Sequence, residues 1–464
     1  MESNSDFNYR IIIKLQDFAH LTSEQSLVGL NSFGTVNKLF TSLNAEGIAE
    51  LISKAKEKNP GYQPPNFLNY ISINCDNESK AREIVNGLKK IDAVEHAYVE
   101  ASSVSPPSVS CNSNPLLGYQ QYLNAAPIGI DAKYAWRFPG GNGQGRVKFI
   151  DIEQGWIKEH EDIKINRLPI TGFSHYQHED HGAAVLGVIM MLDNKVGGVG
   201  ITPNANGYIV SQWRPDGTFN TADAIMSAIA HLNAGDILLL EAQSFDAIYT
   251  KKIWPVEIQD ANFQLIQLAT ALGIVVIEAA GNGMYSMGND LDGYTDHNGG
   301  NIFNRSKECF KDSGAILVAA ASSEMPHTKI NYSNYGSRID CYAWGENVVT
   351  AGDYPFASGL SKKNYSFKFC GTSSASAIIT GAAIALQNIV ERKFGYKMSP
   401  VQMREILSNK KYGTESKRGH STDKIGVMPD LKKIIDEVLN SDFISKQQLK
   451  YNIRKTKLST NEFS

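Results

Sequence analysis

The segment from Gly371 to Ala377 reads GTSSASA and runs directly into the apolar, helix-favouring stretch IITGAAIALQNIV. This pattern puts the hydroxyl of Ser373 where a loop becomes a buried helix. The first turn of a helix has unpaired backbone N–H groups and the positive end of the helix dipole, and both stabilise the negative charge that develops when a hydroxyl attacks a carbonyl. Ser373 is therefore a candidate nucleophile. The alternative is that Ser373 only caps the helix, a common role of serine, so the assignment depends on partners.

A serine nucleophile needs a base to take its proton and a third group to orient that base. Asp151 ends the strand-favouring run RVKFID, and functional groups gather at the carboxyl ends of strands in open α/β sheets. His181 opens the segment HGAAVLGVIMML, whose small and apolar residues favour a buried helix. We therefore predict that His181 is the base and that Asp151 orients it. Asn282 follows a further buried-strand pattern, GIVVIEAAG, and its side-chain amide is the candidate donor to an oxyanion.

Each of these three partners also has a structural interpretation. An aspartate at the end of a strand can serve as a cap, a histidine can simply begin a helix, and Asn-Gly is typical of a turn. The order Asp, His, Asn, Ser in matching local sequences nevertheless resembles the subtilisin-like serine proteases. The resemblance covers roughly residues 120 to 435, and includes the segments QQYLNAAPIGIDAKYAW, HGAAVLGVIMMLDNKVGGVGITPNA, SGAILVAAASS and INYSNYGSRIDCYAWG.

The resemblance implies a fold and an activity. The fold is α/β, a mostly parallel sheet flanked by helices. The activity is that of a serine endopeptidase that needs no cofactor for its chemistry and acts on protein or peptide substrates. On the family's mechanism, His181 takes the proton of Ser373, Asp151 fixes the tautomer of His181, and Asn282 with the backbone N–H of Ser373 binds the oxyanion. A rival from another class is a catalytically silent binding or scaffold protein that keeps the subtilisin-like fold.

The expected substrate cleft departs from the family pattern. The segment DILLLEAQSF has Glu241 and Gln243 where the family has small residues, and Glu278 lies in an apolar strand shortly before Asn282. One interpretation is an acidic cleft that selects basic residues in the substrate. The other pairs Glu241 and Glu278 with cationic side chains or backbone N–H groups, as most half-buried carboxylates are paired.

Two segments suggest metal ligands. The cluster HYQHEDHG holds three histidines, but His181 already belongs to the fuller catalytic motif, so we interpret His175 and His178 as solvent or substrate contacts. The loop LDNKVGGVG, together with Asp162, resembles a calcium-binding arrangement of secreted subtilisins. The resemblance implies a structural calcium ion held by Asp162, Asn194 and nearby carbonyl oxygens, which suit this hard cation.

The first part of the chain, residues 1–101, reads as a separate small α+β domain. The runs YRIIIKL, NYISINC and VEHAYVE favour strands, and ESKAREIVNGLKKI favours an amphipathic helix. This pattern resembles the inhibitory propeptide of subtilisin-like proteases, which implies a zymogen inhibited by its own N-terminal domain. The alternative is a permanently attached accessory domain.

The remaining boundaries follow from composition. Residues 102–116 form a Ser- and Pro-rich linker, residues 117–440 the catalytic domain and residues 441–464 a polar, basic tail. Exposed linkers are where chains are cut, so we expect processing between Glu100 and Asn114.

Whole-chain properties exclude several other classes. The 464-residue chain has a net charge of -3, which provides no electrostatic reason to expect a nucleic-acid partner. No apolar run predicts a transmembrane segment. The start MESNSDFNYR lacks the pattern of a secretory signal, so we expect a cytoplasmic location, or export by a route without a classical signal. The five cysteines are widely spaced and predict neither a disulfide framework nor a zinc site.

Overall fold

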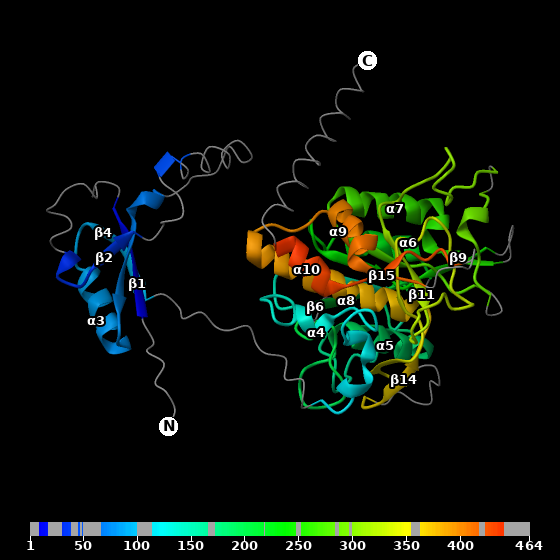
Figure 1. Cartoon of the computed structure of the whole chain (residues 1–464), viewed down its shortest axis with the longest axis horizontal. Coiled ribbons are helices and arrows are strands. Elements are labelled where there is room, and N and C mark those ends of the chain that lie inside the picture. The colour runs from blue at the N-terminus through cyan, green and yellow to red at the C-terminus, as the bar shows by residue number, and fades with distance from the viewer. Residues whose placement is uncertain are drawn as a thin grey trace, which may run out of the picture. The chain divides into compact units, whose positions relative to one another are not determined.

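The computed structural model describes residues 9–16, 30–38, 45–46, 49, 66–99, 114–165, 172–217, 219–246, 252–283, 287–296, 299–353, 362–416 and 423–439 (Figure 1). The chain divides into two compact units, Met1–Ser105 and Pro106–Ser464. Most of the predicted linker and the whole predicted tail lie outside the described residues, as does the expected processing segment up to residue 113.

The N-terminal unit is a small antiparallel sheet with one helix packed against it. The sheet has the order β2-β3-β1-β4, and its elements are β1 (Tyr9–Leu15), β2 (Val36–Lys38), η1 (Phe67–Asn69), β3 (Tyr70–Cys75), α3 (Glu78–Leu88) and β4 (Val94–Val99). Alternate residues of β1, Ile11 and Ile13, are buried in one hydrophobic cluster with Val85 and Leu88 of α3. The helix begins after Asn77, whose side chain accepts the backbone N–H of Lys80 at 3.1 Å.

The second unit is built around an eight-stranded sheet. From one edge to the other its strands are β15 (Gly413–Glu415), β16 (Val427–Pro429), β12 (Cys341–Trp344), β11 (Ile316–Ala321), β10 (Val275–Ala279), β7 (Ile237–Leu240), β5 (Lys148–Glu153) and β6 (Asn206–Ser211). All neighbouring strands are parallel except β15 and β16. A parallel sheet is covered on both faces, which is why strands such as ILLL and ILVAAA are apolar throughout. The predicted α/β fold is confirmed.

Helices and two short hairpins complete this unit. The helices are α4 (Ala132–Ala135), α5 (Glu179–Met190), α6 (Thr221–Ile229), α7 (Asp260–Ala271), α8 (Thr372–Phe394), α9 (Pro400–Leu407) and α10 (Leu431–Leu439). Single 3-10 turns are η2 (Leu117–Tyr119), η3 (Gln121–Leu123), η4 (Tyr176–His178), η5 (Val256–Ile258), η7 (Leu291–Gly293) and η8 (Lys410–Tyr412). The antiparallel hairpins pair β8 (Gln243–Asp246) with β9 (Lys252–Pro255), and β13 (Val348–Ala351) with β14 (Tyr365–Phe369).

The two faces of the sheet have separate cores, because successive residues of a strand point to opposite sides. On β7, Ile237 and Leu239 pack in the cluster that contains α5 and α8, whereas Leu238 and Leu240 pack in the cluster that contains α6 and α7. Figure 1 shows α6 and α7 on one side of the sheet and α4 and α5 on the other. The side a residue faces therefore follows from its place in this alternation.

Helix α8 is the central helix of the molecule. Among the described residues it is the one helix long and apolar enough to cross a membrane, but its apolar window is wholly buried inside the protein. Nineteen consecutive residues from Thr372 to Val390 are buried. A helix that is apolar all round fits a position in the core, packed against the sheet and α5.

Candidate active site

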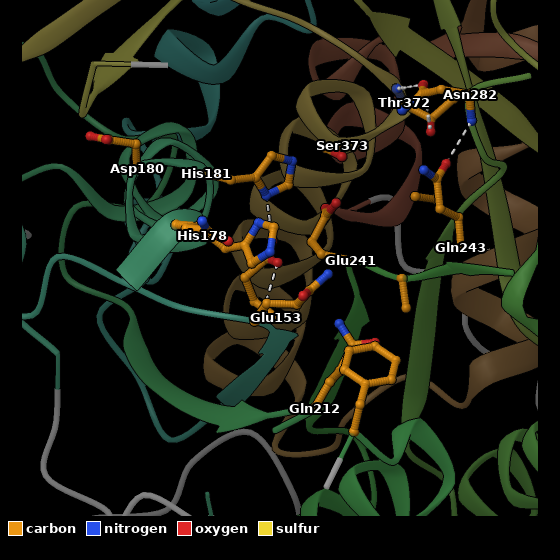
Figure 2. A pocket seen from close by; sticks show the side chains of 15 residues that line it. Glu153, His178, Asp180, His181, Gln212, Glu241, Gln243, Asn282, Thr372 and Ser373 are labelled. Atoms are coloured by element: carbon orange, nitrogen blue, oxygen red, sulfur yellow. Dashed lines mark hydrogen bonds and ion pairs between the residues drawn. The ribbon is translucent and has the colours of Figure 1, made fainter. Parts of the chain in front are cut away.

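Five of the predicted site residues meet at the carboxyl edge of the sheet: His181, Glu241, Gln243, Asn282 and Ser373. The ends of β5 and β7, the loop after β10 and the first turns of α5 and α8 line one pocket of about 330 Å³, at the lower end of the size range of ligand sites. The residues on which its chemistry depends are Glu153, His181, Glu241, Gln243, Asn282 and Ser373, and Figure 2 shows them around one space.

Ser373 lies in the first turn of α8, as its sequence context predicts. Its exposed fraction is 8%, so only a small part of the side chain meets the pocket. The residue before the helix is Gly371, with φ of 99°, a backbone conformation that residues with a side chain rarely adopt. The helix start therefore needs a glycine, and no side chain caps it.

The imidazole of His181 is held by Glu153 and not by Asp151. His181 lies in the first turn of α5, and its Nδ1 is in a short hydrogen bond with Oε2 of Glu153 (Figure 2). Asp151 is fully buried below the pocket, where its Oδ2 accepts the indole N–H of Trp156 at 2.8 Å. The prediction that Asp151 orients the base is thus corrected: Glu153 is the carboxylate on His181.

The strand repeat explains this exchange. Asp151 and Glu153 are two residues apart on β5, so both point to the face that carries α5 and α8, but Glu153 lies about 7 Å further along the strand. Only the second acid reaches the pocket. The sequence signal that could have found it is the pair of acids two residues apart, DIE, at the end of the apolar run.

A close approach between backbones brings α5 to this strand end. A Cβ on Gly182, next to the base, would lie 2.1 Å from the carbonyl oxygen of Gly155 and 2.6 Å from the indole of Trp156. A side chain at position 182 would therefore push the helix away from the loop after β5. The glycine after His181 allows the imidazole to reach Glu153.

Asn282 lies in the loop after β10 and its amide is oriented by the start of α8. Its Oδ1 accepts the backbone N–H of Thr372 at 2.9 Å and the hydroxyl of Thr372 at 3.2 Å. Because the oxygen is occupied in this way, the amide NH₂ is the part of the side chain that remains to donate. The backbone N–H of Asn282 donates to Oε1 of Gln243 at 3.0 Å, a contact drawn in Figure 2, so Gln243 lines the pocket and braces this loop.

Glu241 follows β7 directly and lies beside the catalytic helix. Its backbone N–H donates to the carbonyl of Ile152 at 3.1 Å, and its Oε1 accepts the hydroxyl of Ser376 at 2.5 Å. It continues the face of Ile237 and Leu239, so its carboxylate points toward α8 and into the pocket (Figure 2).

Comparison with known proteins agrees with this arrangement. The model of the subtilase family matches residues 157–427, more than half of the chain. The chain belongs to the subtilase family. It is 27% identical to subtilisin DY of Bacillus licheniformis, over 55% of this chain and 80% of the relative. It is also similar to the intracellular serine protease of Paenibacillus polymyxa, at 23% identity over 59% of this chain and 77% of the relative. The alkaline protease of Alkalihalobacillus alcalophilus is 26% identical over 79% of this chain and 89% of the relative.

Membership of the subtilase family supports a serine peptidase, because subtilases cleave peptides with a serine nucleophile. The family match begins at residue 157 and so includes His181, Asn282 and Ser373 but leaves out β5, where Asp151 and Glu153 differ in position. The part of the site that departs from the sequence prediction thus lies outside the matched segment.

Glu278 does not line the cleft of this subtilase, so its predicted place there is wrong. It follows the alternation of β10 onto the face that carries α7, and its Oε1 accepts the backbone N–H of Glu257 at 3.0 Å. Glu257 in turn pairs with the buried guanidinium of Arg338, with Nε to Oε1 at 2.8 Å. The interpretation that paired Glu278 with a backbone N–H group, rather than with substrate, describes its surroundings.

The pocket brings several carboxyl groups together in buried surroundings. Burial opposes the charged form of His181, but the Glu153 carboxylate and its hydrogen bond, and then Glu241 and Asp151, outweigh burial and raise the pKa of His181 to about 9. Burial first, and then the charge of Glu153, raises the pKa of Glu241 to about 8. Burial also raises the pKa of Asp151 well above its usual range, with Glu153 and Glu241 adding to the shift.

Three of these side chains have the atom types of a metal site. One donor atom each of Glu153, His181 and Glu241 lie within 4.8 Å of one another. However, Glu153 and Nδ1 of His181 already share a hydrogen, which an ion at that nitrogen would have to displace. The hydrogen bond between Glu153 and His181 thus occupies the nitrogen that a metal ion would need.

The predicted calcium ligands fit a cation in part. Asp162 is fully buried, and its Oδ2 accepts the backbone N–H of Gly198 at 3.2 Å while Oδ1 has no hydrogen-bond partner among the described residues. That buried oxygen fits a cation. Asn194 fits less well, because its amide oxygen accepts the backbone N–H of Val196 at 3.0 Å.

Proposed function

We propose that this chain is a serine endopeptidase in which Ser373 is the nucleophile, His181 the general base and Glu153 the residue that orients the base. The single observation that carries the proposal is the joint placement of His181, held by Glu153, and Ser373, in the first turn of α8, on one pocket. Subtilase membership supplies the chemistry that this pocket would perform.

The steps follow from the groups present. Ser373 loses its proton to His181 as it attacks the substrate carbonyl, and the Glu153 carboxylate stabilises the imidazolium and holds its tautomer. The amide of Asn282 and the backbone N–H of Ser373, at the positive end of the α8 dipole, stabilise the oxyanion. His181 then returns the proton to the leaving amine, and water completes the reaction by the same path.

Labelling of the nucleophile tests the proposal and the scaffold alternative together. A fluorophosphonate probe reacts with an activated serine, so the parent protein should be labelled and Ser373→Ala should not. Thr380→Ala, which removes another buried hydroxyl of the same helix, is the matched control and should keep its label. No labelling of the parent, either at full length or after removal of the N-terminal unit, would favour a silent scaffold.

The N-terminal unit is proposed to be an intramolecular inhibitor, so that the protein is made as a zymogen. The support is its sheet and helix, which match the propeptide-like pattern of the sequence. Incubating the parent and Ser373→Ala side by side and sequencing any new N-terminus provides the test. Cleavage of the parent between about residues 100 and 114, with an intact variant, supports self-processing; equal behaviour of the two contradicts it. A cytoplasmic location stays a prediction.

The residues that line the pocket lead to an expectation about substrate preference. Glu241 and Gln243 line it, while Glu278 faces the opposite core, so of these two glutamates only Glu241 could contribute to a preference for basic substrate residues. Cleavage of a peptide library by the trimmed enzyme measures this preference. A structural calcium ion at Asp162 is proposed on its unpartnered buried oxygen, with no part in the chemistry.

A further inference from the structure

Glu153 and Glu241 end neighbouring strands on the same face of the sheet. Asp151 of β5 pairs with Leu239 of β7 in the parallel register. Glu153 and Glu241 are each two residues further along, so they stand level and point to the same side. With one donor atom of His181 their carboxylate oxygens lie within 4.8 Å of one another. The imidazole of the base therefore has two acidic neighbours, where the triad mechanism requires one.

Glu241 is built into the catalytic helix. Its Oε1 accepts the hydroxyl of Ser376 at 2.5 Å, and Ser376 lies one turn after Ser373 on the same helix. The exposed fraction of Glu241 is 6%, and its Oε2 is buried with no hydrogen-bond partner among the described residues. A buried carboxylate with an unpaired oxygen is costly unless a proton or a cation is close. Figure 2 shows His181 and Ser373 next to its carboxyl end.

The charges around the imidazole come from every element that packs on it. From β5 they are Asp151 and Glu153, from η4 His178, from the first turn of α5 Asp180, and from the end of β7 Glu241. The first turn of α8 contributes only hydroxyl groups. Apart from His178, these neighbours are carboxyl groups. The carboxyl group of Asp180 has another partner, since its Oδ1 accepts the backbone N–H of Asp353 at 3.0 Å.

We propose that Glu241 is a positioning residue of the catalytic base: anchored by the Ser376 hydroxyl, its carboxyl group stands beside the His181 imidazole as a second acidic partner and stabilises the protonated ring. The inference rests on the proposed peptidase function. Because the imidazole must be neutral to accept a proton, activity should rise with pH through the pKa of His181, about 9. Removal of the Glu241 carboxylate should therefore lower the pH at which the His181 ring loses its proton.

The variant Glu241→Gln tests the proposal through the pH profile. Glutamine keeps the shape and can still accept from Ser376, but it has no charge. The acid limb of kcat/KM should move to lower pH by about one unit, since loss of one nearby carboxylate typically changes a pKa by that order. Glu179→Gln is the control, because Glu179 is a carboxylate in the same first turn of α5 whose Oε1 accepts the hydroxyl of Ser174 at 2.9 Å. An acid limb that stays in place in Glu241→Gln, or moves equally in Glu179→Gln, overturns the proposal.

A second measurement does not depend on turnover. In the Ser373→Ala background, the ring of His181 is titrated by NMR with labelled histidine, and its signals are assigned by their loss in His181→Ala. Adding Glu241→Gln should lower the His181 pKa by about one unit, whereas an unchanged pKa contradicts the role of Glu241. If the labelling experiment fails while this shift is observed, the peptidase assignment is wrong but the coupling of Glu241 to His181 stands.

Discussion

Asp151 and Glu153 are two residues, or one strand repeat, apart on β5, and this spacing decides which carboxylate contacts His181. Asp151 is bonded to the Trp156 indole in a buried place, and its raised pKa favours a neutral carboxyl group there. Glu153, at the strand end, accepts from Nδ1 of His181. The longer glutamate side chain at the later position thus takes the orienting role that the sequence pattern suggested for the aspartate.

Exchanging each acid for its amide separates the two roles. Glu153→Gln should lower kcat by roughly a thousandfold to ten-thousandfold, because the amide no longer fixes the tautomer or stabilises the imidazolium. Asp151→Asn should cost much less, since the amide oxygen can still accept from Trp156. Steady-state kinetics on one peptide substrate measure both. A larger loss in Asp151→Asn than in Glu153→Gln would return the orienting role to Asp151.

Asn282 allows a second prediction at this scale. Asn282→Ala should lower kcat by about a hundredfold to a thousandfold, the usual effect of losing one oxyanion donor. The fold should be retained, because the variant loses only the side-chain contacts with Thr372 at the surface of the pocket. A melting temperature close to that of the parent checks the fold. Full activity in the variant would show that the amide does not bind the oxyanion.

The position of an acidic residue along its strand decides which face of the sheet its side chain occupies. On β5 and at the end of β7, the acids continue the face of α5 and α8 and so reach the pocket. Glu278 of β10 is one residue out of that alternation and faces α7, where it meets the backbone of η5. Burial, and then the charge of Glu257, raises the pKa of Glu278 well above its usual range. Because Glu278 is buried away from the pocket, it affects the stability of the fold rather than catalysis.

The raised pKa of Glu278 predicts how stability depends on pH. Between the unfolded pKa, about 4.3, and the higher folded pKa, the folded protein binds one proton more, so this group lowers the free energy of unfolding as pH rises through that interval. Glu278→Gln has no such proton, so its stability relative to the parent should increase with pH. Urea unfolding at acid and at alkaline pH measures the difference. A difference independent of pH would show that Glu278 is not protonated in the fold; activity should be the same in both proteins.

The 464-residue chain joins an antiparallel N-terminal unit to a subtilase unit whose central helix, α8, is buried from Thr372 to Val390. Helix α8 brings Ser373 to the pocket, α5 brings His181, and the sheet brings Glu153 and Glu241 to the same edge. Asp162 lies outside this pocket, in a loop region where a cation would act on stability rather than chemistry.

The proposed calcium ion predicts a change in thermal stability. Calcium should raise the melting temperature of the parent, and a chelator should lower it, because an ion that binds only the folded state stabilises it by mass action. Asp162→Asn should abolish the response. Asp296→Asn is a control, because it removes a carboxylate that accepts the backbone N–H of Gly300 at 2.8 Å in another loop. A melting temperature that ignores calcium in the parent contradicts the site.

The sequence alone predicts the family, the mostly parallel sheet and the positions of Ser373, His181 and Asn282 at the ends of elements, because local motifs and apolar runs report which residue begins a helix or follows a strand. It left open which of two acids meets the base and which glutamates reach the cleft. The folded structure resolves both points, because they depend on which face each strand presents and on the register between β5 and β7. A shift of one residue reverses the face and a shift of two moves a side chain about 7 Å, differences that the composition of a run does not record.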